Sequence, residues 1–358
     1  MIFIPNLVQP SIYNHQIVTA GMAWLGANNG AIPSDWDTPE AKALFITNYK
    51  LDIMKAFDRK CIFRDLHRVH TITHGNSSTF YYTGTACAHY HEKGRMILGS
   101  NNPPISKTII NVDGLLIADL MIDDLEDAML HLDVRQEFSH QQGEALANAM
   151  DERIARLFYL AARSGPKNLD HPGGSVITAA NAGTDGEVLA DCIFAAAQTL
   201  DEKDTPESDR FIVVKPAQYY MLTKVKDLIN RDFGGSGSIK NVQLDSIANM
   251  PIKKSMNLPN GQNITTRIKG ENNDYTGNFT NSVAIVAQRG AVGTVKLKDV
   301  SVKMSGSEVR ILFEGQLITA SYAMGHGVLD PRLAVEIAAD STGTATPVVT
   351  PSTTPSNM

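Results

Sequence analysis

The sequence has few cysteines, few aromatic residues and no excess of basic residues. Its three cysteines, Cys61, Cys87 and Cys192, are widely spaced. Their number and spacing argue against a disulfide scaffold and favour a reducing compartment. Acidic residues outnumber basic residues by 38 to 32, which gives a formal net charge of −6. A basic nucleic-acid-binding protein needs clustered excess Lys and Arg to neutralise phosphates, so this balance argues against that class of protein.

Long apolar runs and a targeting signal are also missing. No stretch approaches the roughly 18 consecutive apolar residues that a membrane helix needs. The N-terminus, MIFIPNLVQP, has neither the basic nor the apolar region of a secretory signal. The composition is globular instead, with 43% hydrophobic and 20% charged residues among 358. This length allows one large domain or two ordinary ones. Because no long apolar run is present, no membrane partner is expected.

Helical and strand patterns in the first half predict an α+β fold. The first 58 residues are broken by Pro and Gly and indicate an extended arm, which ends in a helix at about Pro39–Ala56. β-Branched and aromatic residues alternate with polar ones over 59–112, which predicts a two-stranded ribbon. One apolar stripe from Val134 to Arg163 predicts a helix of about 45 Å. A shorter helix, Asp124 to Leu132, is expected before it.

The second half first alternates helices and strands and then becomes rich in strands. Helices are expected at Asp185–Leu200 and from Pro216 through Ile229, the second with Tyr220 facing inward. A buried strand is expected at Phe211–Val214. From Ser282 to Ile337 the alternation has a period of two, as in strands. The last residues, Asp340 to Met358, are rich in Thr, Ser and Pro, which predicts an unstructured tail.

One group of residues has the spacing of a metal site. Cys87, His89 and His91 would share one face of a strand, and three such donors could hold a transition metal. No acidic partner stands in an obvious place, and no helical HExxH is present. A plain polar face on the ribbon is the favoured interpretation, so we expect no metal and no cofactor.

Other clusters of titratable residues have simpler interpretations. Three histidines and two arginines gather at the start of the predicted ribbon segment. A solvated face is the favoured interpretation of His67, His70, His74, Arg64 and Arg68. The acidic run from Asp123 to Asp127 precedes a predicted helix, where carboxylates favour the helix dipole. No GxSxG elbow and no phosphate loop is present. The sequence therefore predicts no catalytic residues and no enzyme.

Four segments resemble the major capsid protein of the T-seven group of short-tailed phages (podoviruses). The longest is IINVDGLLIADLMIDDLEDAMLHLDVRQEFSHQQGEALANAMD, residues 109–151. RGAVGTVKLKDVSV at 289–302, SYAMGHGVLDP at 321–331 and the smaller GSIKNV at 237–242 follow in the order of that family. Together they cover about 70 to 75 residues, and the first two are too long for chance agreement.

The resemblance implies an α+β chain with the HK-97-like phage capsid fold. That fold has an N-arm, an excursion called the E-loop, a peripheral domain with a long spine helix, and an axial domain. The corresponding expected segments are an N-terminal arm at 1–58, the E-loop at 59–112, the peripheral domain with its spine helix at 113–170, the axial domain at 171–287, a return to the peripheral domain at 288–338 and a disordered tail at 339–358.

The resemblance also implies a function and partners. The chain is expected to self-assemble as hexamers and pentamers into an icosahedral shell of a T = seven kind, assembled in the host cytoplasm. The expected partners are a scaffolding protein, a portal, a decoration protein and double-stranded DNA held without sequence-specific binding. The alternatives are an encapsulin-like compartment shell and a metal-dependent α+β enzyme. Candidate assembly contacts are Lys93, Arg95, Arg153, Arg156, Gly235, Gly237 and Lys298.

Overall fold

The described part of the chain forms two compact units. The computed structural model describes residues 39–97, 99, 103–123, 132–167, 171–225, 244–306, 314–339 and 348–351. Unit 1 takes its described residues from Met1–Ala56, Ile117–Gly143 and Ser301–Ala320, and unit 2 from Phe57–Leu116, Glu144–Val300 and Ser321–Met358. The arm as far as residue 38, the expected helix before residue 132, Gly235 and Gly237 lie outside the described residues.

The helices follow the sequence patterns closely. Helix α2 spans Pro39–Lys60 and helix α4 spans Leu132–Arg163, which confirms both predictions. Helix α5, Gly186–Glu202, begins where the Asp185 side chain accepts a hydrogen bond from the Glu187 amide, an ordinary N-cap. Helix α6, Pro216–Leu222, starts at the expected proline but ends earlier than predicted. No described helix has the length and apolar character needed to cross a lipid bilayer.

A four-stranded sheet has the order β1-β12-β13-β4, formed by Arg68–Thr71, Val292–Met304, Gly315–Val328 and Leu116–Asp123. Unit 1 contains most of α2 and β4, the first part of α4, and parts of β12 and β13. Gln142 on α4 accepts a hydrogen bond from the Tyr49 hydroxyl of α2 at 2.9 Å. The Gln142 amide donates to the carbonyl of Ile318 on β13 at 3.3 Å. One buried side chain thus joins three elements of this unit.

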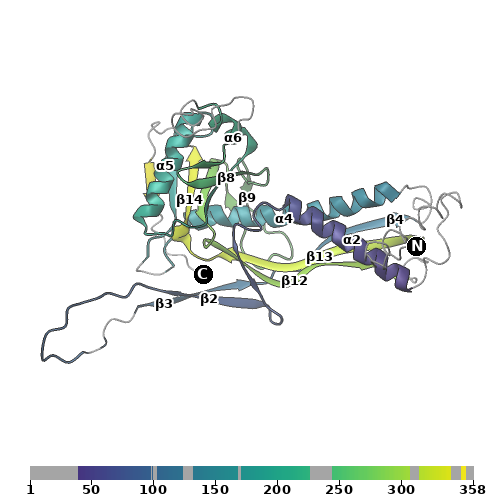
Figure 1. The fold of residues 1–358 in the computed structure, drawn as a ribbon, viewed down its shortest axis with the longest axis horizontal. Coiled ribbons are helices and arrows are strands. Elements are labelled where there is room, and N and C mark those ends of the chain that lie inside the picture. The colour runs from purple at the N-terminus through teal and green to yellow at the C-terminus, as the bar shows by residue number, and fades with distance from the viewer. Residues whose placement is uncertain are drawn as a thin grey trace, which may run out of the picture. The chain divides into compact units, whose positions relative to one another are not determined.

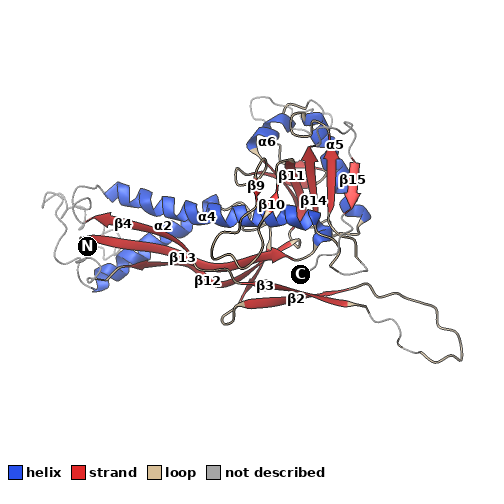
Figure 2. Ribbon diagram, turned by 180° about the vertical axis from the view of Figure 1, so that it is seen from behind, coloured by secondary structure: helices blue, strands red, loops and turns tan. Residues whose placement is uncertain are grey.

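Unit 2 contains a seven-stranded sheet with α5 and α6 beside it (Figure 2). Its strand order is β15-β5-β14-β11-β6-β8-β7, formed by Val348–Pro351, Ser175–Ala179, Ala334–Ala339, Ser282–Gln288, Arg210–Val214, Met250–Lys254 and Ser246–Ile247. Strands β6 and β11 are buried along their whole length. Leu189 and Ile193 of α5 pack with Ile212 and Val286 in the core of this sheet.

Three features of unit 2 differ from the expectations. Strand β14 lies between β5 and β11, so it belongs to the sheet of the expected axial segment and not to a return with β12 and β13. The tail is not unstructured throughout, because β15 pairs antiparallel with β5 and extends the sheet by main-chain hydrogen bonds. Tyr220, expected to face inward on α6, is 57% exposed.

A two-stranded ribbon is present within the predicted range but is shorter than predicted. Strands β2, Ser77–Thr83, and β3, Ile105–Asn111, pair antiparallel (Figure 1), whereas Arg68–Thr71 pairs with β12. One face packs Phe80, Tyr82 and Ile110 with Val295 and Leu329. At Gly325 of β13 any Cβ would lie 1.8 Å from the Asn111 carbonyl oxygen, so only glycine allows this close approach.

Candidate assembly surfaces

The outer face of the ribbon exposes large apolar side chains to solvent. Side chains alternate across a strand, so burying Phe80, Tyr82 and Ile110 turns their neighbours outward. Tyr81 is 71% exposed, Ile105 69% and Ile109 52%. The ribbon register places Thr79 opposite Ile109 and Tyr81 opposite Lys107, so these side chains form one face. Several large apolar side chains exposed on one face favour an interaction site there.

The segment beyond the two ribbon strands does not support the metal hypothesis. Cys87, His89 and His91 lie in residues 84–92, which form no strand, so the shared strand face that the hypothesis required is absent. All three side chains are exposed. Within the described residues no group of three or more His, Cys, Asp or Glu side chains is placed to hold a metal ion.

The predicted assembly contacts fall into two groups. Lys93 and Arg95 are exposed near the turn between the ribbon strands, where Arg95 pairs with Glu92 at 3.1 Å, and Lys298 is half-buried on β12. Arg153 instead pairs with buried Glu271 at 3.0 Å, and Arg156 pairs with Glu152 of its own helix at 3.3 Å. These two arginines of α4 therefore have partners within the chain.

Two buried carboxylates connect α4 to distant segments, and sequence patterns did not reveal them. Asp151 accepts hydrogen bonds from the Cys61 thiol and from the backbone amides of Ile62 and Phe63 at 2.9 to 3.2 Å. Near the helix end, Arg163 forms two bonds of 2.6 Å to the fully buried Glu336 of β14. In the sequence, the only sign of each contact is a charged residue within the predicted long helix, Asp151 in one case and Arg163 in the other.

Two histidines are fully buried in unit 2, so the expected solvated face does not include His67. The His67 ring donates from Nδ1 to the Phe63 carbonyl at 2.6 Å, and His326 Nδ1 lies 2.7 Å from the Thr294 hydroxyl. Burial lowers the pKa of His67 to about 4, with nearby Arg289 adding to the effect. Burial also lowers the pKa of His326 well below its usual value. Both rings are neutral in the folded chain.

We therefore expect the isolated subunit to lose stability in mild acid. The unfolded histidines bind protons below about pH 6.5, whereas the folded ones do not until lower pH, so stability is lost as pH falls from about 6.5 towards 4. His67 alone contributes about 3 kcal/mol to this loss. Urea unfolding across this range measures it. In His67→Gln the slope falls by about 1.4 kcal/mol per pH unit. The exposed control His70→Gln keeps the wild-type slope, and an unchanged slope in His67→Gln would contradict the assignment.

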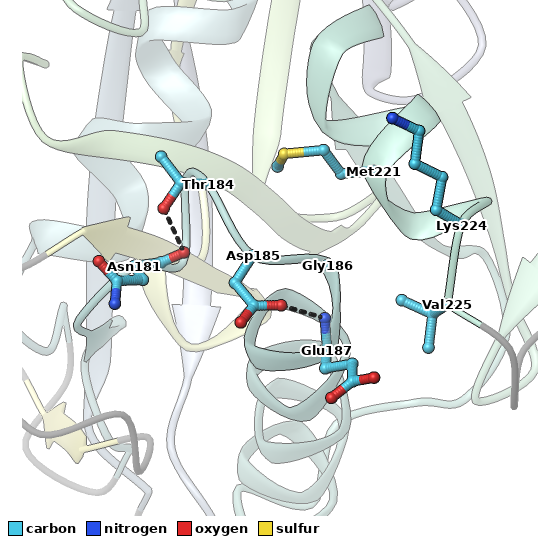
Figure 3. Close-up of a pocket in the computed structure, with 8 residues that line it drawn as sticks. All are labelled: Asn181, Thr184, Asp185, Gly186, Glu187, Met221, Lys224 and Val225. Atoms are coloured by element: carbon cyan, nitrogen blue, oxygen red, sulfur yellow. Dashed lines mark hydrogen bonds between the residues drawn. The ribbon is translucent and has the colours of Figure 1, made fainter.

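A recess lies at the start of α5 in unit 2 (Figure 3). Its volume is about 660 Å³, and Asp185, Glu187, Met221 and Lys224 are among its lining residues. The Asp185 carboxylate is engaged in capping α5, and the Thr184 hydroxyl donates to the Asn181 carbonyl. Among the described lining residues, the Thr184 hydroxyl is bonded to a backbone carbonyl and not to a side-chain base, so it is not arranged as an activated nucleophile.

Comparison with known proteins identifies the family. The family model described as "Gp10A-like: Major capsid protein" matches residues 80–338. The major capsid protein of Escherichia phage T7 is 32% identical over 321 residues, which cover 82% of this chain and 90% of that protein. The major capsid protein of Enterobacteria phage T3 is 29% identical and covers 87% of this chain and 94% of its own length.

Solved capsids share the fold. In the capsid structure of the cyanophage P-SCSP1u, one chain superposes with a TM-score of 0.72 at 35% identity, over 79% of this chain and 89% of that chain. A chain of the mature capsid of bacteriophage PhiM1 superposes with a TM-score of 0.63 at 19% identity, over 78% and 87%. The α+β fold is thus the HK-97-like capsid fold, and the chain belongs to the Gp10A-like family of phage major capsid proteins.

Proposed function

We propose that copies of this chain assemble as hexamers and pentamers into an icosahedral shell around double-stranded phage DNA. The observation that supports this most directly is the exposed apolar face of the ribbon at Tyr81, Ile105 and Ile109. A two-stranded ribbon is marginal in water without further packing, and a neighbouring copy in a shell would cover this face. Proteins of this family are located in the virion capsid. We infer that copies of this chain assemble in the host cytoplasm.

The charge balance fits a container for DNA. With a net charge of −6 the chain has no excess cations to neutralise phosphates, so we infer that it encloses DNA without gripping it. Many modest contacts per copy would stabilise the shell through multivalency. A scaffolding protein, a portal and a decoration protein are the further partners we infer. We infer no catalytic role, since the homologues are structural capsid proteins.

Electron microscopy tests this function directly. The full chain is produced alone and together with the scaffolding protein of its phage, and each sample is imaged. We expect closed icosahedral shells in the presence of scaffold. Dispersed particles of about the 38.9 kDa chain mass in both samples would contradict the proposal. A ribbon variant that replaces Tyr81, Ile105 and Ile109 with polar residues, and is therefore expected to assemble poorly, serves as the negative control for shell formation.

A further inference from the structure

A second cavity of unit 2 is lined by more basic than acidic side chains. This excess positive charge takes no part in the assembly surface described above. The volume of the cavity is about 360 Å³. We call it the basic pocket and define it by Arg68 of β1, Tyr82 of β2, Lys167 and His171 after α4, and Asp330 and Arg332 before β14. Four separate stretches of sequence therefore contribute these residues to one cavity beside the base of the ribbon.

The single carboxylate of the basic pocket is already paired. Arg332 Nε lies 2.7 Å from Asp330 Oδ2, and the Arg332 backbone amide donates to Oδ1 at 3.2 Å. The Arg332 guanidinium also lies 3.4 Å from His171 Nδ1. Asp330 therefore compensates the charge of Arg332, and no other carboxylate among the described lining residues compensates the positive charges of Arg68 and Lys167.

Three polar groups of the basic pocket have no partner in the described part of the chain. They are the Arg68 guanidinium, the Lys167 ammonium and the Tyr82 hydroxyl. Burial lowers the pKa of Lys167 and raises that of Tyr82, so both groups are partly removed from water. Removing an ammonium group from water is costly unless a carboxylate or another acceptor compensates. The pocket is thus prepared for an anionic ligand.

We propose that the basic pocket binds the acidic run Asp123, Asp124, Glu126 and Asp127 of a second copy of this chain. The inference rests on the proposed assembly. The run places four carboxylates within five residues, which is the densest cluster of one charge in the sequence. Carboxylates would pair with the guanidinium, the ammonium and the hydroxyl through charge-assisted hydrogen bonds. A shell holds copies at high effective concentration, so one such contact per copy need not be strong alone.

Cysteine crosslinking tests which chain supplies the run. Thr83→Cys places a thiol in the pocket lining, and Leu125→Cys places one within the run without removing a carboxylate. Both are made in the full chain with Cys87→Ser, because Cys87 is exposed while Cys61 and Cys192 are buried. After oxidation of assembled shells we expect a ladder of dimers and higher multimers on a non-reducing gel. A variant with only one of the two introduced cysteines is expected to form no crosslinked species larger than a dimer. Monomer-mass bands alone, with or without an internal crosslink, would overturn the proposal.

A charge-reversal series tests the energetic role of the contact. Arg68→Glu with Lys167→Glu is expected to lower shell yield at least tenfold while the thermal midpoint of the unassembled subunit is kept. Adding Asp124→Lys and Glu126→Lys restores the yield. The control Lys50→Glu with Lys253→Glu makes the same charge change at exposed positions and keeps the yield within twofold. If wild-type shells form and the pocket variant also gives the full shell yield, this inference is wrong and the proposed function stands. If the wild-type chain forms no shells, both the proposed function and this inference are wrong.

Discussion

Arg163→Met is expected to lower the free energy of unfolding of the isolated subunit by about 3–5 kcal/mol, because it leaves a buried carboxylate without its partner. Glu336 has no exposed surface, and its two oxygens receive Arg163 at 2.6 Å and the Ser282 hydroxyl at 2.6 Å. Burial alone would lower the pKa of the Arg163 guanidinium, but Glu336 more than offsets this and raises it. Urea unfolding at pH 7 measures the loss.

Arg156→Met is the matched control on the same helix. Arg156 pairs with Glu152, whose side chain is half exposed, so its removal is expected to cost 0 to about 1 kcal/mol. The double variant Arg163→Met with Glu336→Met should lose less than the sum of the two single variants, since no unpaired charge remains. Equal losses for Arg163→Met and Arg156→Met would show that the buried pair has no special role.

The second large effect is expected at the outer face of the ribbon. The triple variant Tyr81→Thr, Ile105→Thr and Ile109→Thr removes the exposed apolar surface but keeps residues that suit strands. We expect at least a tenfold loss of shell yield, because the contact between copies loses its apolar burial. The thermal midpoint of the unassembled subunit should stay unchanged, since these side chains face solvent there. Sedimentation and electron microscopy of the same preparations measure both properties.

Lys107→Thr provides the control for that variant. Lys107 lies on the same exposed face of β3, opposite Tyr81, but contributes no large apolar side chain. Its shell yield is expected to remain within twofold of wild type. Normal shells from the triple variant would mean that the ribbon face is not an assembly surface. A lowered thermal midpoint would instead show that these side chains stabilise the subunit itself.

The features behind these predictions differ in how far apart their residues lie in the sequence. Features that depend on neighbouring residues could be predicted from the sequence, whereas contacts between distant residues could not. The long helix α4, the ribbon strands β2 and β3 and the buried strand β6 were predicted because hydrophobic periodicity is a local property. The family was recognisable because its longest matching segment, 109–151, is a continuous stretch. The absence of a catalytic motif was likewise visible in the sequence alone.

Tertiary structure alone decided the features that join distant residues. Arg163 and Glu336 are 173 residues apart, and only the placement of β14 between β5 and β11 brings them together. His67 belongs to a polar cluster in the sequence, yet the packing around it buries the ring completely. β15 forms because β5 offers an open edge, which no property of the Thr- and Pro-rich tail indicates. Sheet order and side-chain burial depend on long-range pairing, whereas sequence periodicity reports only which face of each element is apolar.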